Sequence, residues 1–403
     1  MLKQDPYIRK AEHYLQTLCS VQPNRRTGSA GNWEASQFIA DTIRPFGYEI
    51  DATPFPCLDY VREEVLLAQG DQTYQVLISP YSIGCDVTAE LVVVSTMAEL
   101  EASGCQGKIL LMHGAICAEQ LMPKNFIFYN PEHHQQIIAF LEAKQPAGII
   151  TATQKNPELI GALYPFPIFL DGDFDIPSVY CTDLVGNELS RSEGECFHLR
   201  INARRIPSQA ANVIARLNPA AGQKIVITAH IDAYEGSPGA VDNASGTAVL
   251  LLLAEMLADY HGPYGIEIAA FNGEDHYSVG GQMDYLGRYG AELPATWLAI
   301  NVDGVGYKEG RAAYSLYGCE PQLEQHALEI LDSSDGLVRG ERWYNGDHMI
   351  FVQSGVSCIA LTAELLPEIM RTVVHAEYDT PQIVDCGKIV DVAQALNVLI
   401  RSI

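Results

Sequence analysis

Two kinds of hydrophobic pattern divide the chain. Residues 5–20 and 32–47 carry apolar side chains at the three- and four-residue spacing of an amphipathic helix. Between about residues 58 and 204, the apolar residues come instead in short runs that are typical of β-strands, such as EEVLLAQG, GKILLMHG and AGIITATQ. We therefore expect a β-rich segment to be inserted between two parts of a different kind.

From Ile206 onward, apolar strands alternate with helices. The strand-like runs include KIVITAH, GIEIAAFNG, ATWLAINVDGVG and VSCIALTAE, and the longest helical run is GTAVLLLLAEMLADYH. This alternation predicts an α/β fold in which a mainly parallel mixed sheet is sandwiched by helices. We expect residues 1–57 and 205–403 to form this domain and residues 58–204 to form a separate, inserted β-rich domain.

The ends of these strands carry side chains of the kind that bind metal ions. In mainly parallel sheets, functional groups gather just beyond the carboxyl ends of the strands. Histidines mixed with carboxylates form a nitrogen and oxygen ligand set that suits zinc, with cobalt or manganese as substitutes. The residues at the strand ends and in the loops that follow are His230, Asp232, Asp242, Glu274, Asp275, Asp303, His375 and Asp379.

Several of these residues are placed for particular tasks. Asp242 follows a glycine-rich turn that permits close approach, so we expect it to bridge two metal ions about 3.5 Å apart. His230 and Asp232 point the same way along a strand, so the Asp232 carboxylate can accept the second ring N–H of His230. Glu274 and Asp275 are neighbours that diverge, so one can bind a metal while the other acts as general base.

One further histidine pair lies outside this set. His133 and His134 open a helical stretch at residues 131–146. No carboxylate or cysteine partner is evident nearby, so we expect a solvated helix end rather than a metal site.

The composition limits the kinds of partner and the cellular compartment that we expect. The 403 residues include 25 Lys and Arg against 50 Asp and Glu, a formal net charge of −25. Such a charge repels nucleic acid and anionic membranes but accepts metal ions and free amines. The N-terminus lacks the pattern of an export signal, and the ten cysteines include no CxxC pair. We expect reduced thiols and a cytoplasmic location, with no nucleic-acid or membrane partner.

The chain resembles the co-catalytic zinc aminopeptidase family, which includes bacterial leucyl aminopeptidases, glutamate carboxypeptidase and relatives of glutaminyl cyclase. The resemblance is carried by AHIDAYEGSPGAVDNASGTAVLLLLAE, AAFNGED, INVDGVG, YNGDHMIFVQSGV and VVHAEYDT. The N-terminal RRTGSAGNWEASQFIADTIRPFGYEI matches the opening helices of the family. The inserted segment is similar to a protease-associated domain in GKILLMHG, AGIITATQ and IPSVYCTDLVGNELS.

This resemblance implies a zinc-peptidase fold with two zinc ions per chain. It also implies that Glu274 is the general base and that Asp232 supports His230. The implied metal ligands are His230, Asp242 and Asp303 for one ion, and Asp242, Asp275 and His375 for the other.

The chain departs from the family pattern at two places. Asp275 stands where the family usually has glutamate, which is one methylene longer, so the strand must come closer or the second metal is held differently. Some relatives have a tyrosine just before the last histidine, where it can stabilise an oxyanion. Val374 occupies that position here, and Tyr344 and Tyr378 are the candidate replacements.

The first functional interpretation is a metallo-aminopeptidase that removes one residue at a time from peptide N-termini. A carboxypeptidase or dipeptidase stays open; it needs a cation for the substrate carboxylate, with Arg339, Arg342 and Arg371 as candidates. A one-metal glutaminyl cyclase conflicts with the retention of every ligand of both metals. A catalytically inactive binding protein would be marked by lost ligands, and Asp275 is the single departure. The sequence leaves the oligomeric state open, a homodimer included.

Overall fold

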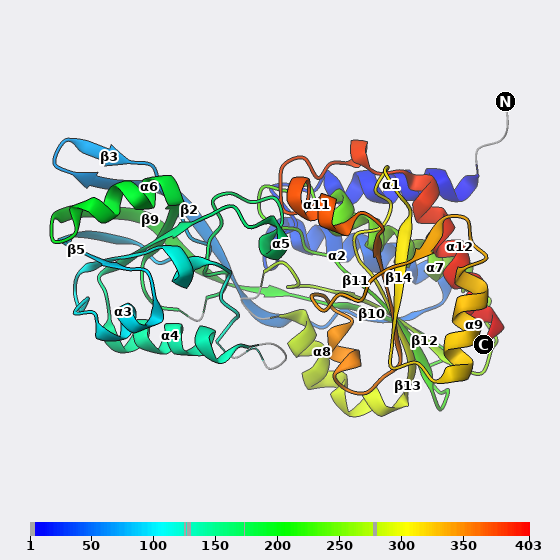
Figure 1. Ribbon diagram of the computed structural model, residues 1–403. Helices are drawn as coiled ribbons and strands as arrows, with labels where there is room; N and C mark the ends of the chain where they lie inside the picture. The colour runs from blue at the N-terminus through cyan, green and yellow to red at the C-terminus, as the bar shows by residue number, and fades with distance from the viewer. Residues whose placement is uncertain (1–4, 125, 127–129, 173, 277–279) are drawn as a thin grey trace. The chain divides into compact units, whose positions relative to one another are not determined.

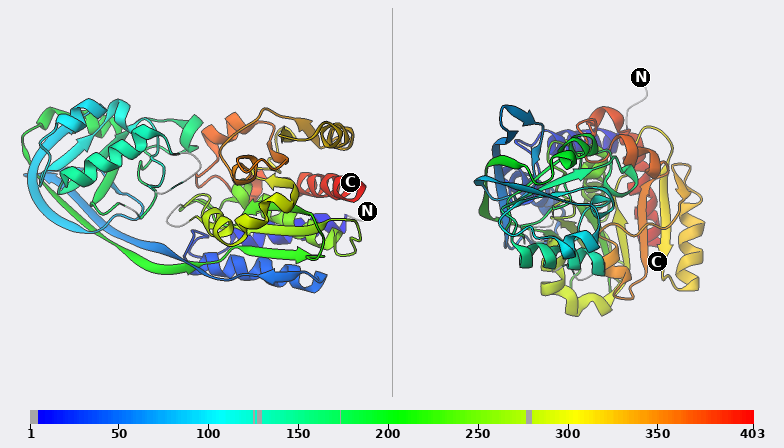
Figure 2. Two further views of the ribbon diagram at one scale, coloured as in Figure 1. Left: turned by 90° about the horizontal axis from the view of Figure 1, so that it is seen from below. Right: turned by 60° about the vertical axis from the view of Figure 1, so that its left-hand side comes forward.

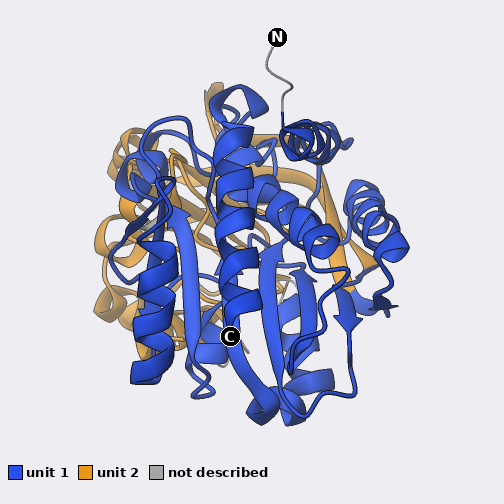
Figure 3. Ribbon diagram, turned by 90° about the vertical axis from the view of Figure 1, so that its right-hand side faces the viewer, with its two compact units in different colours: residues 1–56, 209–403 blue, residues 57–208 orange. Residues whose placement is uncertain are grey.

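The computed structural model describes residues 5–124, 126, 130–172, 174–276 and 280–403. The chain divides into two compact units (Figure 3). Unit 1 comprises residues 1–56 and 209–403, and unit 2 comprises residues 57–208. The chain therefore leaves unit 1 and returns to it once.

Unit 1 is built on one mixed sheet. Its four central strands, in the order β12-β11-β13-β16, run parallel to one another, and antiparallel strands flank them on both sides. The predicted mainly parallel mixed sheet is thus confirmed. Within the described residues its strands are, in spatial order, β1 (Glu49–Asp51), β10 (Val213–Leu217), β12 (Gly265–Phe271), β11 (Lys224–His230), β13 (Thr296–Val302), β16 (Cys358–Ala363), β14 (Ala312–Tyr317) and β15 (Leu337–Arg339).

Helices from the two ends of the chain pack together in unit 1. Helices α1 and α12 contact each other and α7, which lies against β11 (Figures 1 and 2). The described helices and short helical turns of unit 1 are α1 (Pro6–Cys19), α2 (Ala30–Ile43), η1 (Arg44–Phe46), η4 (Ala240–Ala244), α7 (Ser245–Met256), α8 (Gly281–Tyr289), η5 (Gly290–Ala295), α9 (Pro321–Leu331), α10 (Met349–Val352), α11 (Leu366–Thr372), η6 (Pro381–Ile383) and α12 (Cys386–Ser402).

Strand β12 shows how both faces of the sheet are covered. Ile266 and Ile268 belong to the apolar core that also contains α7. Successive strand residues point to opposite faces. On the other face, the ring of Phe271 lies 5.1 Å from that of Tyr285 in α8. Helices therefore pack on both sides of β12, as the alternation of strands and helices predicts.

Unit 2 has a sheet and apolar cores of its own. Strands β5 to β8 run parallel, and β9 and β4 pair antiparallel with the outer two of them. Its described strands are, in spatial order, β3 (Gln72–Tyr74), β2 (Phe55–Gln69), β9 (Cys196–Ala210), β5 (Cys85–Val94), β6 (Ile109–Met112), β7 (Gly148–Thr153), β8 (Ser178–Thr182) and β4 (Leu77–Ile78). Its described helices and turns are α3 (Met97–Ala102), η2 (Gly114–Cys117), α4 (Glu132–Lys144), α5 (Pro157–Ile160), α6 (Asp183–Leu189) and η3 (Ser190–Ser192).

The cysteines and the helices bear on the expected compartment. All ten cysteines lie in the described residues, and each is free. Burial raises the pKa of the Cys57 and Cys181 thiols to about 12, so both behave as small apolar residues. Within the described ranges, no helix has the length and apolar character needed to cross a bilayer. The cytoplasmic location stays a prediction.

Candidate metal centre

Three neighbouring parallel strands bring ligand-type residues to one edge of the unit 1 sheet. Strand β11 ends at His230, and β12 and β13 pair with it on either side. Glu274 and Asp275 follow β12 after a short turn, and Asp303 follows β13 directly. The carboxyl ends of parallel strands lie at the same edge of a sheet, so these side chains converge there.

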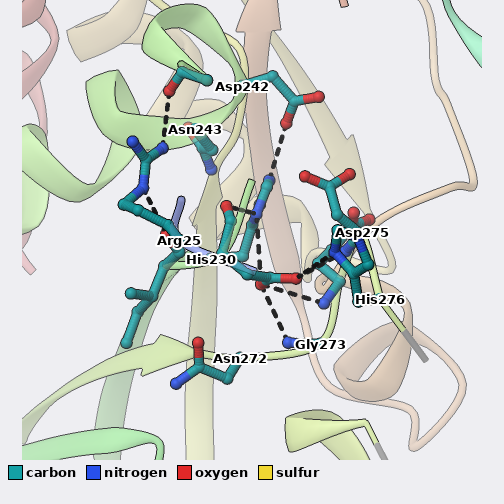
Figure 4. A network of polar contacts seen from close by, with 12 residues as sticks. Arg25, His230, Asp242, Asn243, Asn272, Gly273, Asp275 and His276 are labelled. Atoms are coloured by element: carbon teal, nitrogen blue, oxygen red, sulfur yellow. Dashed lines mark hydrogen bonds and ion pairs between the residues drawn. The ribbon is translucent and has the colours of Figure 1, made fainter. Parts of the chain in front are cut away.

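The first of two clusters at this edge contains His230, Asp242 and Asp303, whose ligand-type atoms lie within 4.8 Å of one another. Nε2 of His230 lies 3.0 Å from Oδ1 of Asp242 and 3.4 Å from Oδ1 of Asp303. Nδ1 of the buried His230 ring donates to the main-chain oxygen of Asp232 at 3.1 Å (Figure 4). Nε2 therefore faces the carboxylates, and it offers a lone pair to a metal when the ring is neutral.

The second cluster shares Asp242 and adds Asp275 and His375. Nε2 of His375 lies 2.9 Å from Oδ1 of Asp275 and 3.4 Å from Oδ2 of Asp242. The two oxygens of Asp242 thus face two different histidines. The structure brings together both residue sets that the resemblance implies, and the shorter Asp275 reaches its partner.

Asp232 has a different partner from the one expected. Its carboxylate lies 3.8 Å from Nδ1 of His230, which donates instead to the main-chain oxygen. The Asp232 carboxylate accepts the main-chain N–H groups of Gly273 at 3.0 Å, Glu274 at 3.3 Å and Asp275 at 3.1 Å (Figure 4). Asp232 therefore fixes the loop that carries the two adjacent carboxylates.

The loop between β11 and η4 is anchored by Arg25, the first residue of the N-terminal segment that resembles the family. Its buried guanidinium donates to the main-chain oxygens of Ile231 at 3.0 Å, Pro238 at 2.7 Å and Gly239 at 2.9 Å. A further bond to Leu18 at 2.9 Å ties the loop to the end of α1. Main-chain oxygens leave no trace in the sequence, so no pattern could have indicated these contacts.

Asp379 fixes the main chain at Asp242, the residue that the two clusters share. Its Oδ1 accepts the N–H of Val241 at 2.7 Å, and its Oδ2 accepts the N–H of Asp242 at 3.0 Å. Burial raises the pKa of Asp379 to about 7, and the charge of Asp242 adds to this shift, whereas the two main-chain bonds oppose it. The structure thus places Asp379 behind the clusters rather than in them.

Burial and charge shape the pKa values inside the clusters. Burial, with the charges of Asp275 and Asp303, raises the pKa of Glu274 well above its usual range against the opposing charge of His230. Burial and the charge of Asp242 raise the pKa of Asp275. Burial lowers the pKa of His230, but the charge of Asp303 and the nearby carboxylates of Asp232 and Asp242 raise it well above its usual range overall. A site that holds protons this firmly is complementary to cations.

Two buried atoms of the site test whether a metal fits. Within the described part of the chain, neither Nε2 of His230 nor Oδ2 of Asp275 has a hydrogen-bond partner. A buried polar atom without a partner costs free energy, and a bound cation removes that cost. Imidazole nitrogens mixed with carboxylate oxygens are the donors that zinc takes in proteins. The residues present therefore fit zinc.

The candidate substrate contacts lie outside the buried clusters. The side chains of Tyr344 and Tyr378 are 60% and 66% exposed, so neither phenol belongs to the buried site. Arg339, Arg342 and Arg371 are all exposed. The sequence could name these residues as candidates but could not show where their side chains lie.

A third cluster, in unit 2, contains Glu119, His133 and His134, with ligand-type atoms within 4.8 Å of one another. The expectation that the two histidines lack a carboxylate partner is therefore wrong: their Nε2 atoms lie 2.9 Å and 3.1 Å from Oε1 of Glu119. Nδ1 of the buried His134, however, accepts the N–H of Met122 at 3.2 Å. The neutral ring then carries its proton on Nε2 and offers no lone pair to a metal there.

The mixed sheet with helices on both faces, and the two clusters of histidine and aspartate at one edge of it, agree with the predicted zinc-peptidase fold. Residues 212–400 match the model of Peptidase family M28. The predicted resemblance to the zinc aminopeptidases is confirmed by this match and by the fold of the solved structures below.

Individual relatives agree with this assignment. An aminopeptidase of Pseudomonas aeruginosa is 26% identical over 375 residues, which cover 85% of this chain and 67% of the relative. The structure of an aminopeptidase from Aneurinibacillus sp. strain AM-1 matches with a TM-score of 0.75 at 21% identity, covering 98% of this chain and 93% of that one. BSAP, a zinc aminopeptidase from Bacillus subtilis, matches with a TM-score of 0.73 at 19% identity, covering 99% and 96%.

Proposed function

We propose that this protein is a metallo-aminopeptidase that removes residues from the N-termini of peptides and holds two zinc ions per chain. The observation that carries the proposal is the pair of clusters that share Asp242. A carboxylate that faces His230 through one oxygen and His375 through the other suits a bridge between two metal ions. The similar proteins reported above are named aminopeptidases, which supports the same activity.

The proposed ligands follow the clusters. His230, Asp242 and Asp303 hold one ion, and Asp242, Asp275 and His375 hold the other. Bound zinc supplies a Lewis acid for the scissile carbonyl and lowers the pKa of a coordinated water. Cobalt or manganese suits the same donors as a substitute.

Glu274 is the proposed proton carrier. It precedes Asp275, and Asp232 holds the main-chain N–H groups of both residues, so the base and the ligand leave one fixed loop side by side. The Glu274 carboxylate accepts a proton from the attacking water and passes it to the leaving amine.

The alternative functions have less support. A carboxypeptidase needs a cation held ready for the terminal carboxylate of its substrate. The three candidate arginines are exposed, and the buried Arg26 forms an ion pair with Glu235 at 2.9 Å. Neither a one-metal glutaminyl cyclase nor an inactive binding protein needs the second cluster of ligand-type residues.

We also propose that unit 2 is a protease-associated-like domain inserted into the peptidase. Its separate sheet and its two apolar cores support an independently packed unit. Peptides are the proposed partners of the whole chain, and the negative net charge favours substrates that carry a free amine. A homodimer is compatible with this proposal but is not needed by it.

A matched pair of substrates tests the activity. Aminoacyl-anilides with a free amine should be cleaved, whereas the same compounds with an acetylated amine should not. A chelator should abolish the cleavage, and added zinc should restore it. Cleavage of the blocked compounds alone, or full activity in excess chelator, would overturn the proposal.

A further inference from the structure

The side chain of Tyr234 stacks on two imidazole rings, that of the cluster residue His375 and that of His276, which follows Asp275 in the sequence. Its ring stacks on His375, with centroids 4.8 Å apart and planes 21° apart, and on His276, with centroids 5.5 Å apart and planes 29° apart. Tyr234 belongs to the loop that joins β11 to η4 and is only 7% exposed. We propose that Tyr234 is a positioning residue that holds His375, and through it the second metal site. This inference rests on the proposed two-zinc centre.

His375 needs support of this kind. Its main chain has a φ of 66°, a left-handed conformation that residues with a Cβ rarely adopt and that persists only where the surroundings hold it. Its side chain retains 18% exposure, whereas that of the other cluster histidine, His230, retains 1%. Stacking of one face on a buried ring restricts the rotation of the imidazole. Tyr234 therefore orients the more exposed of the two ligand histidines.

The second stacking partner extends the effect to the neighbouring ligand. His276 directly follows Asp275 and is fully buried. Neither of its ring nitrogens has a hydrogen-bond partner among the described residues, and Nδ1 lies 3.9 Å from Oδ2 of Asp232. Packing against Tyr234 thus helps to place His276 and the main chain from which Asp275 projects. One aromatic ring therefore contacts His375 and the residue that follows Asp275, two of the three ligand-bearing segments of the second cluster.

The shorter aspartate makes this placement matter. Asp275 has one methylene less than glutamate, so it tolerates less displacement from His375, which it meets at 2.9 Å. The loop that carries Tyr234 is itself held by Arg25 and by the ion pair between Arg26 and Glu235. A fixed loop that carries a flat side chain therefore keeps His375 and Asp275 at the distance that metal binding needs.

Zinc binding measured directly tests the inference. Tyr234→Leu removes the ring, and Tyr234→Phe keeps it. Tyr289→Leu is the matched control, because Tyr289 is 9% exposed, stacks on a guanidinium and lies in α8 away from the cluster residues. Zinc affinity would be measured by competition with a chromogenic chelator, and the geometry of the site by the visible absorption of the cobalt-substituted protein.

We expect Tyr234→Leu to lower the affinity for one zinc ion about 10- to 100-fold, which is the range for residues that orient ligands. The affinity for the other zinc ion should not change. The cobalt spectrum should change with the lowered affinity, and Tyr234→Phe should restore both properties. Tyr289→Leu should lower the melting temperature and keep both ions. Unchanged zinc affinity in Tyr234→Leu, or an equal loss in Tyr289→Leu, would overturn the inference.

These measurements do not depend on turnover. Weakened zinc in Tyr234→Leu with no peptidase activity in the wild type would sustain the inference and reject the proposed function. Peptidase activity together with unchanged zinc affinity would do the reverse.

Discussion

The clusters of both units combine histidines with carboxylates, but they differ in the direction of one hydrogen bond. In unit 1, Nδ1 of His230 donates to a main-chain oxygen, whereas in unit 2, Nδ1 of His134 accepts a main-chain N–H. A neutral imidazole carries a proton on one nitrogen only. In the neutral rings, Nε2 therefore carries a lone pair in unit 1 and a proton in unit 2. Proximity of histidine to carboxylate does not by itself define a metal site.

The charge balance of the clusters differs in the same sense. In unit 2, burial raises the pKa of Glu119, but hydrogen bonds from His133 and His134 lower it overall, so one carboxylate is satisfied by two rings. In unit 1, carboxylates outnumber histidines, and Oδ2 of Asp275 has no hydrogen-bond partner in the described chain. The excess of carboxylates in unit 1 favours a bound cation, whereas in unit 2 the two histidines already face the single carboxylate.

The largest expected effect is a loss of turnover that occurs in a unit 1 variant and not in the matched unit 2 variant. Glu274→Gln removes the proposed proton acceptor and leaves the metal ligands intact, so kcat should fall by roughly 10²- to 10⁴-fold with zinc content unchanged. Glu119→Gln makes the same chemical change in unit 2 and should keep the wild-type kcat. Turnover of an aminoacyl-anilide and elemental analysis check both variants. Loss of zinc in Glu274→Gln with turnover retained would assign the two adjacent carboxylates the reverse roles.

The next effect concerns the stoichiometry of the metal. Asp275→Asn replaces an anionic ligand by a weaker neutral one, so zinc should fall from two ions toward one per chain, and excess zinc should restore part of the activity. Asp284→Asn, which breaks an ion pair with Arg288 in α8, is the control and should keep two ions. Two tightly held ions in Asp275→Asn would remove this residue from the ligand set.

A smaller effect is expected behind the ligands. Asp379→Asn replaces one of two acceptor oxygens by a donor that faces a main-chain N–H, so Asp242 should lose its orientation and zinc affinity should fall about 10- to 100-fold. Asp385→Asn changes an exposed helix cap and should leave zinc affinity unchanged. Competition with a chelator measures both. Equal affinities in the two variants would mean that Asp379 only stabilises the fold.

The smallest effect lies in unit 2 and depends on pH. The pKa of Glu119 is below its ordinary value of 4.5, so its charge stabilises the folded state above that pH, and this contribution is lost as the pH falls through the folded pKa. Glu119→Gln should lower the free energy of unfolding by about 1 kcal/mol near pH 7, discounted for exposure to solvent. Hydrogen exchange in α4 should show a difference that shrinks below pH 4.5. A difference that instead depends on added zinc would make the cluster a metal site.

His230, Asp275 and Asp303 could be predicted because each ends or closely follows a strand that is visible in the sequence. The apolar runs that end at His230 and Asp303 fix the edge of the sheet where both residues lie. The supporting residues could not be predicted in this way. Arg25 acts on main-chain oxygens, and Tyr234 acts on ring faces from loops far apart in the sequence.

Two expectations failed for the same physical reason. Strand geometry predicts that Asp232 and His230 point the same way, but it does not show that the N–H groups of residues 273–275 compete for the carboxylate. The partner of His133 and His134 lies in a loop before their helix, where spacing carries no signal. Contacts made by loops depend on tertiary packing that a pattern of apolar positions does not encode.

Zinc stoichiometry in two double variants tests the central claim most directly. The protein would be dialysed against buffered zinc and analysed for bound metal as the wild type, as His230→Gln/His375→Gln and as His133→Gln/His134→Gln. The account predicts two ions per chain in the wild type, none held tightly in the first variant and two in the second. An ion lost from the His133→Gln/His134→Gln variant, or two ions kept by the His230→Gln/His375→Gln variant, would contradict it.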